Sequence, residues 1–191
     1  MLAIRTIPMI LRPFRRGAES STIAALYGMI VTQARLPAFY ADYGVPDTVE
    51  GRFDLIVLHL VLLLRRLARE NGAARSLGQR LFDTFCRDLD SNLREMGIGD
   101  LAVPKHMRRF AEAFYGRQAA YVAAFDAADE RDFEKALARN IFQTEGIDDR
   151  VARLARYARA ALGGLDAQDQ GAFVRGEVAF PNPEAFADAK A

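Results

Sequence analysis

The sequence predicts an all-α protein, a single-domain bundle of about seven helices. Apolar side chains recur every three or four positions, as on the buried face of a helix, and no window shows the sustained two-residue alternation of a strand. Proline, glycine and N-capping residues fall between these periodic segments, where helices begin and end. Of the 191 residues, 51% are hydrophobic and 27% are charged, which is typical of one folded globular domain.

Three parts of the chain differ in composition. Residues 1–19 form a basic segment that we expect to be flexible, residues 20–167 form the helical domain, and residues 168–191 form an irregular acidic tail. The basic segment is rich in Arg and apolar residues, and Pro8 and Pro13 interrupt any long helix. Such a segment fits a frayed leader, a contact with an anionic membrane surface or a transit peptide. No small-residue cleavage site follows an apolar stretch, which argues against a secretory signal.

The first expected helix begins near Ser20 or Ser21, because both are good N-capping residues. It ends before Pro37, since the residue that precedes a proline avoids helical angles. Residues 38–46 then form a short turn that is rich in aromatic side chains.

The next helix is the most apolar part of the chain. Asp47 and Glu50 have the spacing of a capping box, which predicts a helix that opens here and runs to about Glu70. Its continuous apolar run, residues 55–64, would rise about 15 Å as a helix, half of what a bilayer requires. We therefore expect a buried core helix and no transmembrane span.

Two further helices follow. Ser76 and Gln79 form another capping-box pair at the start of the first one. Gly97 supplies a left-handed stop at its end, with Ile98 placed to pack back on the last turn. Pro104 lies where a proline is tolerated, in the first turn of the second helix.

The last expected helices are shorter. Apolar spacing over residues 133–141 predicts a helix that ends at Gly146. Asp148 is the N-cap of the final helix, which the adjacent Gly163 and Gly164 weaken.

The side chains suited to catalysis are few and isolated. Neither of the two His residues has a partner at the spacing of a metal site or a catalytic triad. His59 lies within the apolar helix, which favours a hydrogen-bonded core histidine, and His106 lies in a basic helix start, which favours a solvated or partner-facing role. Cys86 is the single Cys, so no intrachain disulfide can form, and its apolar surroundings favour an inert buried thiol.

Acidic residues cluster in one segment, at Asp126, Asp129, Glu130, Asp132 and Glu134. All-helical prenyl-transfer enzymes bind magnesium through Asp-rich turns, so a small all-helical enzyme with an Asp-rich metal site is one alternative. Those enzymes use two acidic motifs on facing helices, and this sequence has no second motif. We expect instead that these acids complement the positive end of a helix dipole, and we expect no metal and no cofactor.

The charge distribution argues against recognition of nucleic acid. The net charge is only +1, and residues 20–34, the first expected helix, contain no charged residue. A helix of that kind is a poor binder of a DNA groove. A helical transcription regulator remains the main alternative from another functional class.

Three segments, taken together in their order and spacing, resemble the ubiquinol-cytochrome c chaperone family. They are Tyr43-Gly44-Val45-Pro46-Asp47-Thr48 with Gly51-Arg52-Phe53-Asp54, then Leu93-Arg94-Glu95-Met96-Gly97-Ile98-Gly99-Asp100, and then Val103-Pro104-Lys105 with Phe114-Tyr115-Gly116-Arg117. The resemblance extends over about residues 20–165 and leaves out both termini.

Members of this family help newly made cytochrome b to become part of the cytochrome bc1 complex. The resemblance therefore implies an assembly chaperone and not an enzyme. The implied partner is cytochrome b, apo or newly haem-loaded, and mitochondrial relatives also use a small partner protein and the ribosome. The implied location is the cytoplasm, peripheral at the inner face of the cytoplasmic membrane, or the matrix side in a eukaryote. Residues 1–18 would supply the membrane contact.

Such a chaperone needs a surface that shields the apolar helices of its client, and aromatic and Arg side chains suit this contact. Aromatic residues concentrate between Pro37 and Pro46, where core packing alone would not require them. We predict a client-binding surface with these members: Phe39, Tyr40, Tyr43, Val45, Pro46, Arg52, Lys105, Phe114, Tyr115 and Arg117. Alternatively, the same side chains lock the connections between helices.

Overall fold

The computed structural model describes residues 12–186, and the side chains from residue 20 onward. This part of the chain is α-helical and contains no strand, so the predicted all-α bundle is confirmed. The elements are α1 (Arg12–Ala34), α2 (Ala38–Ala41), α3 (Val49–Ala68), α4 (Gly72–Glu95), α5 (Val103–Asp126), α6 (Arg131–Leu137), the π-helical η1 (Ala138–Phe142), α7 (Asp149–Ala167), α8 (Gln170–Arg175) and the 3₁₀ turn η2 (Pro183–Phe186).

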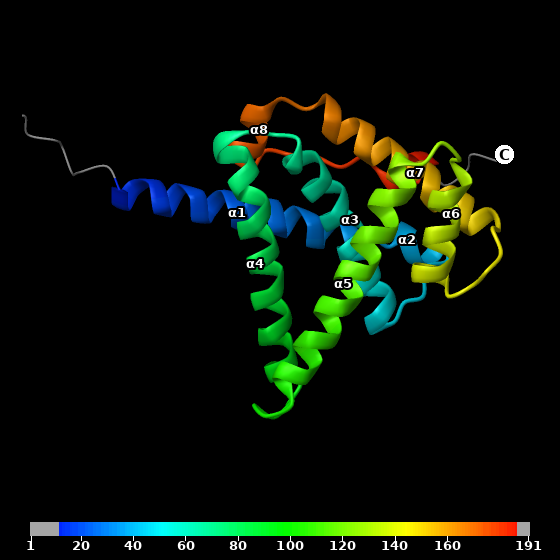
Figure 1. The fold of residues 1–191 in the computed structure, drawn as a ribbon, viewed down its shortest axis with the longest axis horizontal. Coiled ribbons are helices and arrows are strands. Elements are labelled where there is room, and N and C mark those ends of the chain that lie inside the picture. Colours follow the sequence, from blue (N-terminus) through cyan, green and yellow to red (C-terminus); the bar gives the residue numbers. More distant parts are fainter. Residues whose placement is uncertain (1–11, 187–191) are drawn as a thin grey trace, which may run out of the picture.

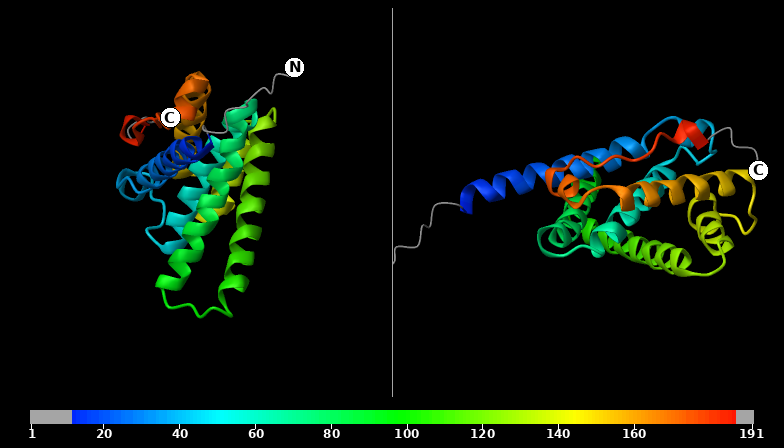
Figure 2. Two further views of the ribbon diagram at one scale, coloured as in Figure 1. Left: turned by 90° about the vertical axis from the view of Figure 1, so that its left-hand side faces the viewer. Right: turned by 90° about the horizontal axis from the view of Figure 1, so that it is seen from above.

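Helix α3 lies at the centre of the bundle, where it contacts α1, α4, α5 and α7 (Figure 1). Helices α4 and α5 form a hairpin whose turn extends away from the other helices (Figures 1 and 2). The start of α1 extends out of the bundle in another direction. None of the helices in residues 12–186 is long and apolar enough to cross a membrane.

The central position of α3 follows from its apolar run. Side chains such as Leu58 and Leu62 have no exposed surface. The cap of this helix differs from our expectation. Thr48, and not Asp47, is the N-cap, with its hydroxyl oxygen accepting from the Gly51 amide at 3.1 Å, because Asp47 instead pairs with Arg52.

Two other helices begin earlier than predicted. Helix α1 starts at Arg12, which places residues 12–19 of the expected flexible segment in a helix. Pro13 does not prevent this, because it lies in the first turn, where its missing amide hydrogen costs nothing. Helix α4 starts at Gly72, so Ser76 is inside the helix, where its hydroxyl donates to the Ala73 carbonyl at 2.7 Å.

The helix stops are a mixture of confirmed and wrong predictions. Gly97 has φ +80°, and the Ile98 amide reaches back to the Leu93 carbonyl at 3.1 Å, so the left-handed stop is confirmed. The Pro104 position and the Asp148 cap are confirmed as well.

One predicted stop is wrong, and one predicted weak point does not interrupt its helix. The helix after residue 131 ends at Phe142 in a π-helical turn, four residues before Gly146, because Gln143 takes the left-handed conformation. Helix α7 continues through Gly163 and Gly164 to Ala167, since the buried Leu165 anchors its last turn.

The C-terminal segment, described as far as residue 186, lies across the bundle and contains α8 and η2. Phe173 is fully buried. The Tyr43 hydroxyl donates to the Pro183 carbonyl at 2.7 Å, and the side-chain amide of Gln33 donates to the Pro181 carbonyl at 2.9 Å. Residues 168–186 of the expected irregular tail thus form a strap over the bundle, with α8 and η2 as its helical turns.

Candidate functional site

The first turn of α3 separates two hollows in the surface. The first, which we call the Tyr40 hollow, has a volume of about 530 Å³. The second, the Asp54 pocket, has a volume of about 440 Å³. Val49, in that turn, lines the Asp54 pocket and is 68% exposed. The Tyr40 hollow is lined by Arg35, Pro37, Tyr40, Ala41, Asp47 and Arg52, and the Asp54 pocket by Val49, Glu50, Phe53, Asp54, His106, Arg109, Phe110, Ala113 and Arg117.

An ion pair closes the inner end of the Asp54 pocket. Oδ1 of Asp54, from α3, lies 2.7 Å from Nη2 of Arg117, from α5. Asp54 is only 1% exposed. Burial raises the pKa of its carboxyl group to about 6, and the guanidinium group opposes part of that rise.

Aromatic rings form the wall of the same pocket. The guanidinium carbon of Arg117 lies 5.7 Å from the ring centre of Phe53, within the range of a cation–π contact. The Phe53 and Phe110 rings lie 5.1 Å apart. Segments of sequence that are about sixty residues apart therefore meet in one pocket, and both belong to the set that resembles the family.

In the Tyr40 hollow, the aromatic ring of Tyr40 lies beside Arg52 from the first turn of α3. The Tyr40 hydroxyl donates to the Ala34 carbonyl at 2.8 Å, which fixes the ring against the end of α1. The Arg52 guanidinium carbon lies 6.0 Å from the centre of that ring, and its Nε lies 2.7 Å from Oδ1 of Asp47. The hollow therefore presents an aromatic face beside an exposed ion pair.

Four residues of the predicted client surface are buried, which corrects the expectation that they face outward. Phe39 and Tyr43 are fully buried, Val45 is 2% exposed and Phe114 is 1% exposed. The Phe39 ring packs against Tyr157 at 4.9 Å between centroids. These side chains support the hollows from within, because they lock the helix connections on which the hollows depend.

The other predicted residues are accessible but do not all lie together. Pro46 is exposed, and its carbonyl group lies against Gly51 in the first turn of α3. Lys105 is exposed on the first turn of α5. Tyr115, which is 56% exposed, borders a different hollow between α4 and α5.

Val49, Asp54 and Phe110 were not among the predicted site residues, although they line the hollows. Asp54 could have been found from the sequence, because an acid next to a continuous apolar run is a candidate for a buried ion pair.

His59 is the hydrogen-bonded core residue that its position predicted. It is fully buried, and Nδ1 lies 2.7 Å from the Leu55 carbonyl, which can only accept, so Nδ1 carries the proton. Nε2 then accepts from the Tyr157 hydroxyl at 2.8 Å, and Gln33 donates to the same hydroxyl at 3.0 Å. Burial lowers the pKa of His59 to about 4, so the ring is neutral at pH 7.

The acidic cluster is engaged in ion pairs along the surface. Asp126 pairs with Arg65 at 2.6 Å, and Lys135 lies 2.7 Å from Asp132 and 3.9 Å from Asp129. Within the described residues, no group of His, Cys, Asp or Glu could hold a metal ion. Cys86 is half-buried, and burial raises the pKa of its thiol.

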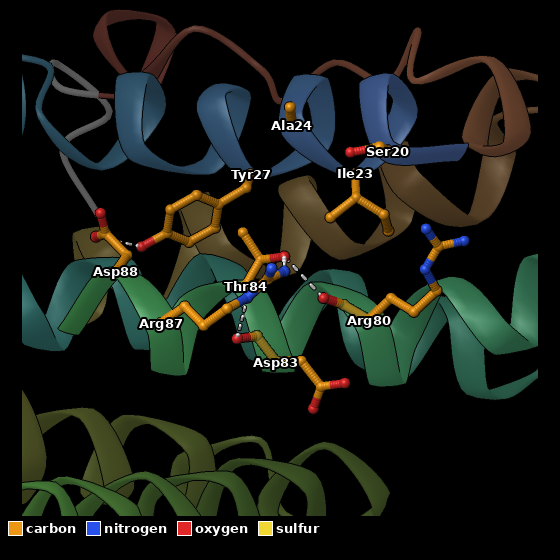
Figure 3. A pocket seen from close by; sticks show the side chains of 9 residues that line it. All are labelled: Ser20, Ile23, Ala24, Tyr27, Arg80, Asp83, Thr84, Arg87 and Asp88. Carbon is orange, nitrogen blue, oxygen red and sulfur yellow. Dashed lines mark hydrogen bonds between the residues drawn. The ribbon is translucent and has the colours of Figure 1, made fainter. Parts of the chain in front are cut away.

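A further hollow of about 800 Å³ lies between α1 and α4 (Figure 3). The Tyr27 hydroxyl donates to Oδ2 of Asp88 at 2.7 Å. Arg87 donates to Oγ1 of Thr84 at 2.8 Å, and that hydroxyl donates to the Arg80 carbonyl at 2.9 Å. The Tyr27–Asp88 bond thus links the two helices, whereas the other two bonds lie within α4.

The fold and the two hollows define an all-α protein whose accessible aromatic and arginine side chains have the composition of a protein interface. The chain belongs to the ubiquinol-cytochrome C chaperone family, whose sequence model matches residues 41–180. The resemblance predicted from the three segments is therefore confirmed.

Known proteins of this group are similar over most of the chain. The crystal structure of the Cbp3 homolog from Brucella abortus has a TM-score of 0.82 and 38% identity, covering 92% of this chain and 98% of that chain. Ubiquinol-cytochrome-c reductase complex assembly factor 1 from Xenopus laevis is 27% identical over 160 residues, which are 82% of this chain and 80% of the frog protein. The human factor is 25% identical over 172 residues, and the match spans 88% of this chain but 57% of the human protein.

Proposed function

We propose that this chain is an assembly chaperone of the ubiquinol-cytochrome c reductase (bc1) complex and that newly made cytochrome b is its client. The family description and the names of the relatives as assembly factors of that complex support the first part. The client is proposed because a membrane subunit needs its apolar helices shielded before it is assembled.

The observation that carries the binding proposal is the pair of hollows at the first turn of α3, where Val49 lines one hollow and Arg52 the other. Each offers an aromatic wall beside an arginine, which suits an apolar helix that enters with one or two large side chains. The residues proposed to touch the client are Tyr40, Pro46, Val49, Arg52, Phe53 and Phe110, with Lys105, Tyr115 and Arg117 at the edges. The buried Phe39, Tyr43, Val45 and Phe114 support this surface from beneath.

We propose that the chain acts by binding alone, without catalysis. Family membership supports this, and each hollow contains an ion pair, Asp54 with Arg117 in one and Asp47 with Arg52 in the other. We place this action at the inner face of the cytoplasmic membrane, or at the matrix side in a eukaryote. A small partner protein or the ribosome remains a proposed further contact.

Site-specific photo-crosslinking tests the surface. A photoreactive amino acid is placed at Tyr40, Val49 or Tyr115, and at Val174 on α8 as a control of similar accessibility. We expect cytochrome b adducts from Tyr40 and Val49 in cells that are making the bc1 complex. Adducts from Val174 alone would reject this surface. Normal cytochrome b content after deletion of the gene would reject the client.

A further inference from the structure

The turn of the α4–α5 hairpin presents apolar side chains to solvent. We call residues 96–102 the hairpin tip. Leu101 is 99% exposed and Met96 is 64% exposed. The tip is convex and lies at the end of a hairpin that extends away from the bundle (Figures 1 and 2). No helix in the part of the chain that the structure describes covers these two side chains.

Backbone hydrogen bonds hold the tip in one shape. The Ile98 amide donates to the Leu93 carbonyl at 3.1 Å and closes α4. The Ala102 amide donates to the Gly99 carbonyl at 2.8 Å, and Val103, the next residue, is 2% exposed. Because the neighbours of Leu101 are fixed in this way, its exposure is a property of the folded turn.

Basic side chains stand one to two turns behind the tip. Lys105 and Arg109 are exposed, lie four residues apart on the same face of α5, and form no ion pair with any residue that the structure describes. Arg108 beside them is paired with Glu112 at 2.8 Å. The arrangement combines an apolar point with a collar of two positive charges that form no ion pair. Of the acids nearby, Asp100 in the tip is paired with Arg94, and Glu95 at the end of α4 accepts a hydrogen bond from Ser91 at 3.4 Å.

We propose that the hairpin tip docks on an anionic membrane surface, with Met96 and Leu101 inserted among the lipid headgroups and Lys105 and Arg109 against the lipid phosphates. An apolar element flanked by Lys and Arg is the combination that binds such an interface. A convex point fits a deformable lipid surface, and the collar complements the negative charge of the lipids. This proposal goes beyond the proposed chaperone function and does not depend on which protein is the client.

Docking through the tip also orients the Asp54 pocket. His106, Arg109 and Phe110 line that pocket and follow Leu101 along α5. At a helical rise of 1.5 Å per residue, Phe110 lies only about 14 Å behind Leu101 along the axis of α5. The mouth of the pocket would then open close to the membrane surface, where a membrane client emerges.

The first test uses the absence of tryptophan from the sequence. Leu101→Trp places a single fluorescent reporter at the tip of the otherwise intact chain, and Val174→Trp is the matched control. Vesicles of phosphatidylcholine with phosphatidylglycerol should shift the Leu101→Trp emission to the blue, and brominated lipids should quench it. Vesicles of phosphatidylcholine alone should give a much weaker response, and Val174→Trp should not respond. An unchanged Leu101→Trp spectrum, or an equal shift from both variants, overturns the proposal.

The second test measures flotation of the full chain with the same vesicles. Met96→Ser with Leu101→Ser should reduce binding by roughly tenfold or more, because two apolar side chains are lost from the contact. Lys105→Gln and Arg109→Gln should each reduce it by about fivefold, and added salt should remove this difference. Val174→Ser should bind as the unaltered chain does.

If all tip and collar variants float normally while replacement of the Arg residues in positions 1–18 abolishes flotation, the N-terminal segment carries the contact and the proposal is wrong. The proposal is also wrong if Leu101→Trp responds to detergent-solubilised cytochrome b and not to vesicles, because the tip would then be a client surface.

Discussion

Asp54 of α3 and Arg117 of α5 form an ion pair of 2.7 Å at the base of a pocket whose walls are Phe53 and Phe110. The carboxylate is almost wholly buried, whereas the guanidinium side chain is 21% exposed. A buried pair of this kind contributes little net stability while it is intact, but loss of one partner leaves a buried charge without compensation. The pair therefore fixes how α3 and α5 meet, and with it the shape of the pocket.

Arg117→Met tests that dependence. We expect a loss of about 3 kcal/mol in the free energy of unfolding at pH 7, because the Asp54 carboxylate is left unpaired. Asp54→Asn with Arg117→Met should recover a large part of this loss, and urea denaturation measures both. Arg108→Met, which breaks an exposed ion pair with Glu112, should leave stability nearly unchanged. Losses that simply add in the double variant would contradict coupling between the two residues.

The raised pKa of Asp54 predicts a pH dependence. Its folded-state pKa of about 6 lies above the ordinary value of 3.8. The protonated carboxyl therefore contributes stability that is fully present below about pH 4 and is lost as the pH rises through 6. Relative to Asp54→Asn, the unaltered chain should lose roughly 2 to 3 kcal/mol of stability between pH 4 and pH 7. A constant difference between the two proteins over this range would show that Asp54 has an ordinary pKa.

His59 should behave in the opposite sense. Its folded-state pKa of about 4 lies below the ordinary value of 6.5, so the stability it contributes is present above pH 6.5 and is lost as the pH falls through 4. We expect the ring to stay neutral, with its proton on Nδ1, when it is observed by NMR down to about pH 5. His106→Gln leaves His59 as the single histidine and removes ambiguity in the assignment. Titration near pH 6.5 would mean that water reaches the ring.

Gly51 is required where α3 begins. A Cβ atom at this position would lie 2.0 Å from the Pro46 carbonyl oxygen, and that backbone is held against the helix. Gly51→Ala should therefore cost about 2 to 4 kcal/mol and lower the yield of folded protein. Gly116→Ala is the matched control inside α5, where nothing lies within 4 Å, and it should stabilise the helix by about 0.5 to 1 kcal/mol. The midpoints of thermal and urea denaturation should fall for Gly51→Ala and rise for Gly116→Ala, relative to the unaltered chain.

The helices could be predicted from the sequence because their signal is local. Apolar periodicity, the Gly97 stop and the Asp148 cap all depend on residues within a few positions of one another. The helix starts were less predictable, since Ser20 and Ser76 have the chemistry of caps but lie inside α1 and α4. Inside a helix, such a hydroxyl bonds to a carbonyl of the preceding turn, as Ser76 does, and nothing local reveals this choice.

The candidate site was only partly predictable, because burial depends on distant segments. The family resemblance identified Arg52 and Arg117, but the meeting of Asp54 with Arg117 requires α5 to return alongside α3. The aromatic turn at residues 38–46 was expected to face outward. Its Phe39 and Tyr43 side chains are buried instead, because the C-terminal strap bonds to Tyr43 from 140 positions away and Tyr157 of α7 packs on Phe39. Neither contact is visible in the local sequence.

The role of the strap can be tested through Tyr43. Tyr43→Phe leaves the ring but leaves the Pro183 carbonyl without its donor, which should cost about 1 kcal/mol. Amide hydrogen exchange should become faster in residues 176–186, since the strap opens more often. Tyr40→Phe is the matched control, because that hydroxyl donates to the nearby Ala34 and not to the strap. Unchanged exchange in the strap of Tyr43→Phe would mean that apolar packing alone holds it in place.

Val49 offers a way to separate client binding from folding. Its side chain is 68% exposed in the first turn of α3, whose residues line both hollows, so Val49→Asp should change stability by less than about 0.5 kcal/mol. A charge at this point should disfavour the approach of an apolar helix to either hollow. We expect cells with Val49→Asp to contain less cytochrome b, with no loss of an unrelated membrane complex. Ile147→Asp, at another exposed apolar residue, is the control. Equal losses of cytochrome b from both variants would mean that neither hollow is the client surface, because the effect would then follow the added charge and not its position.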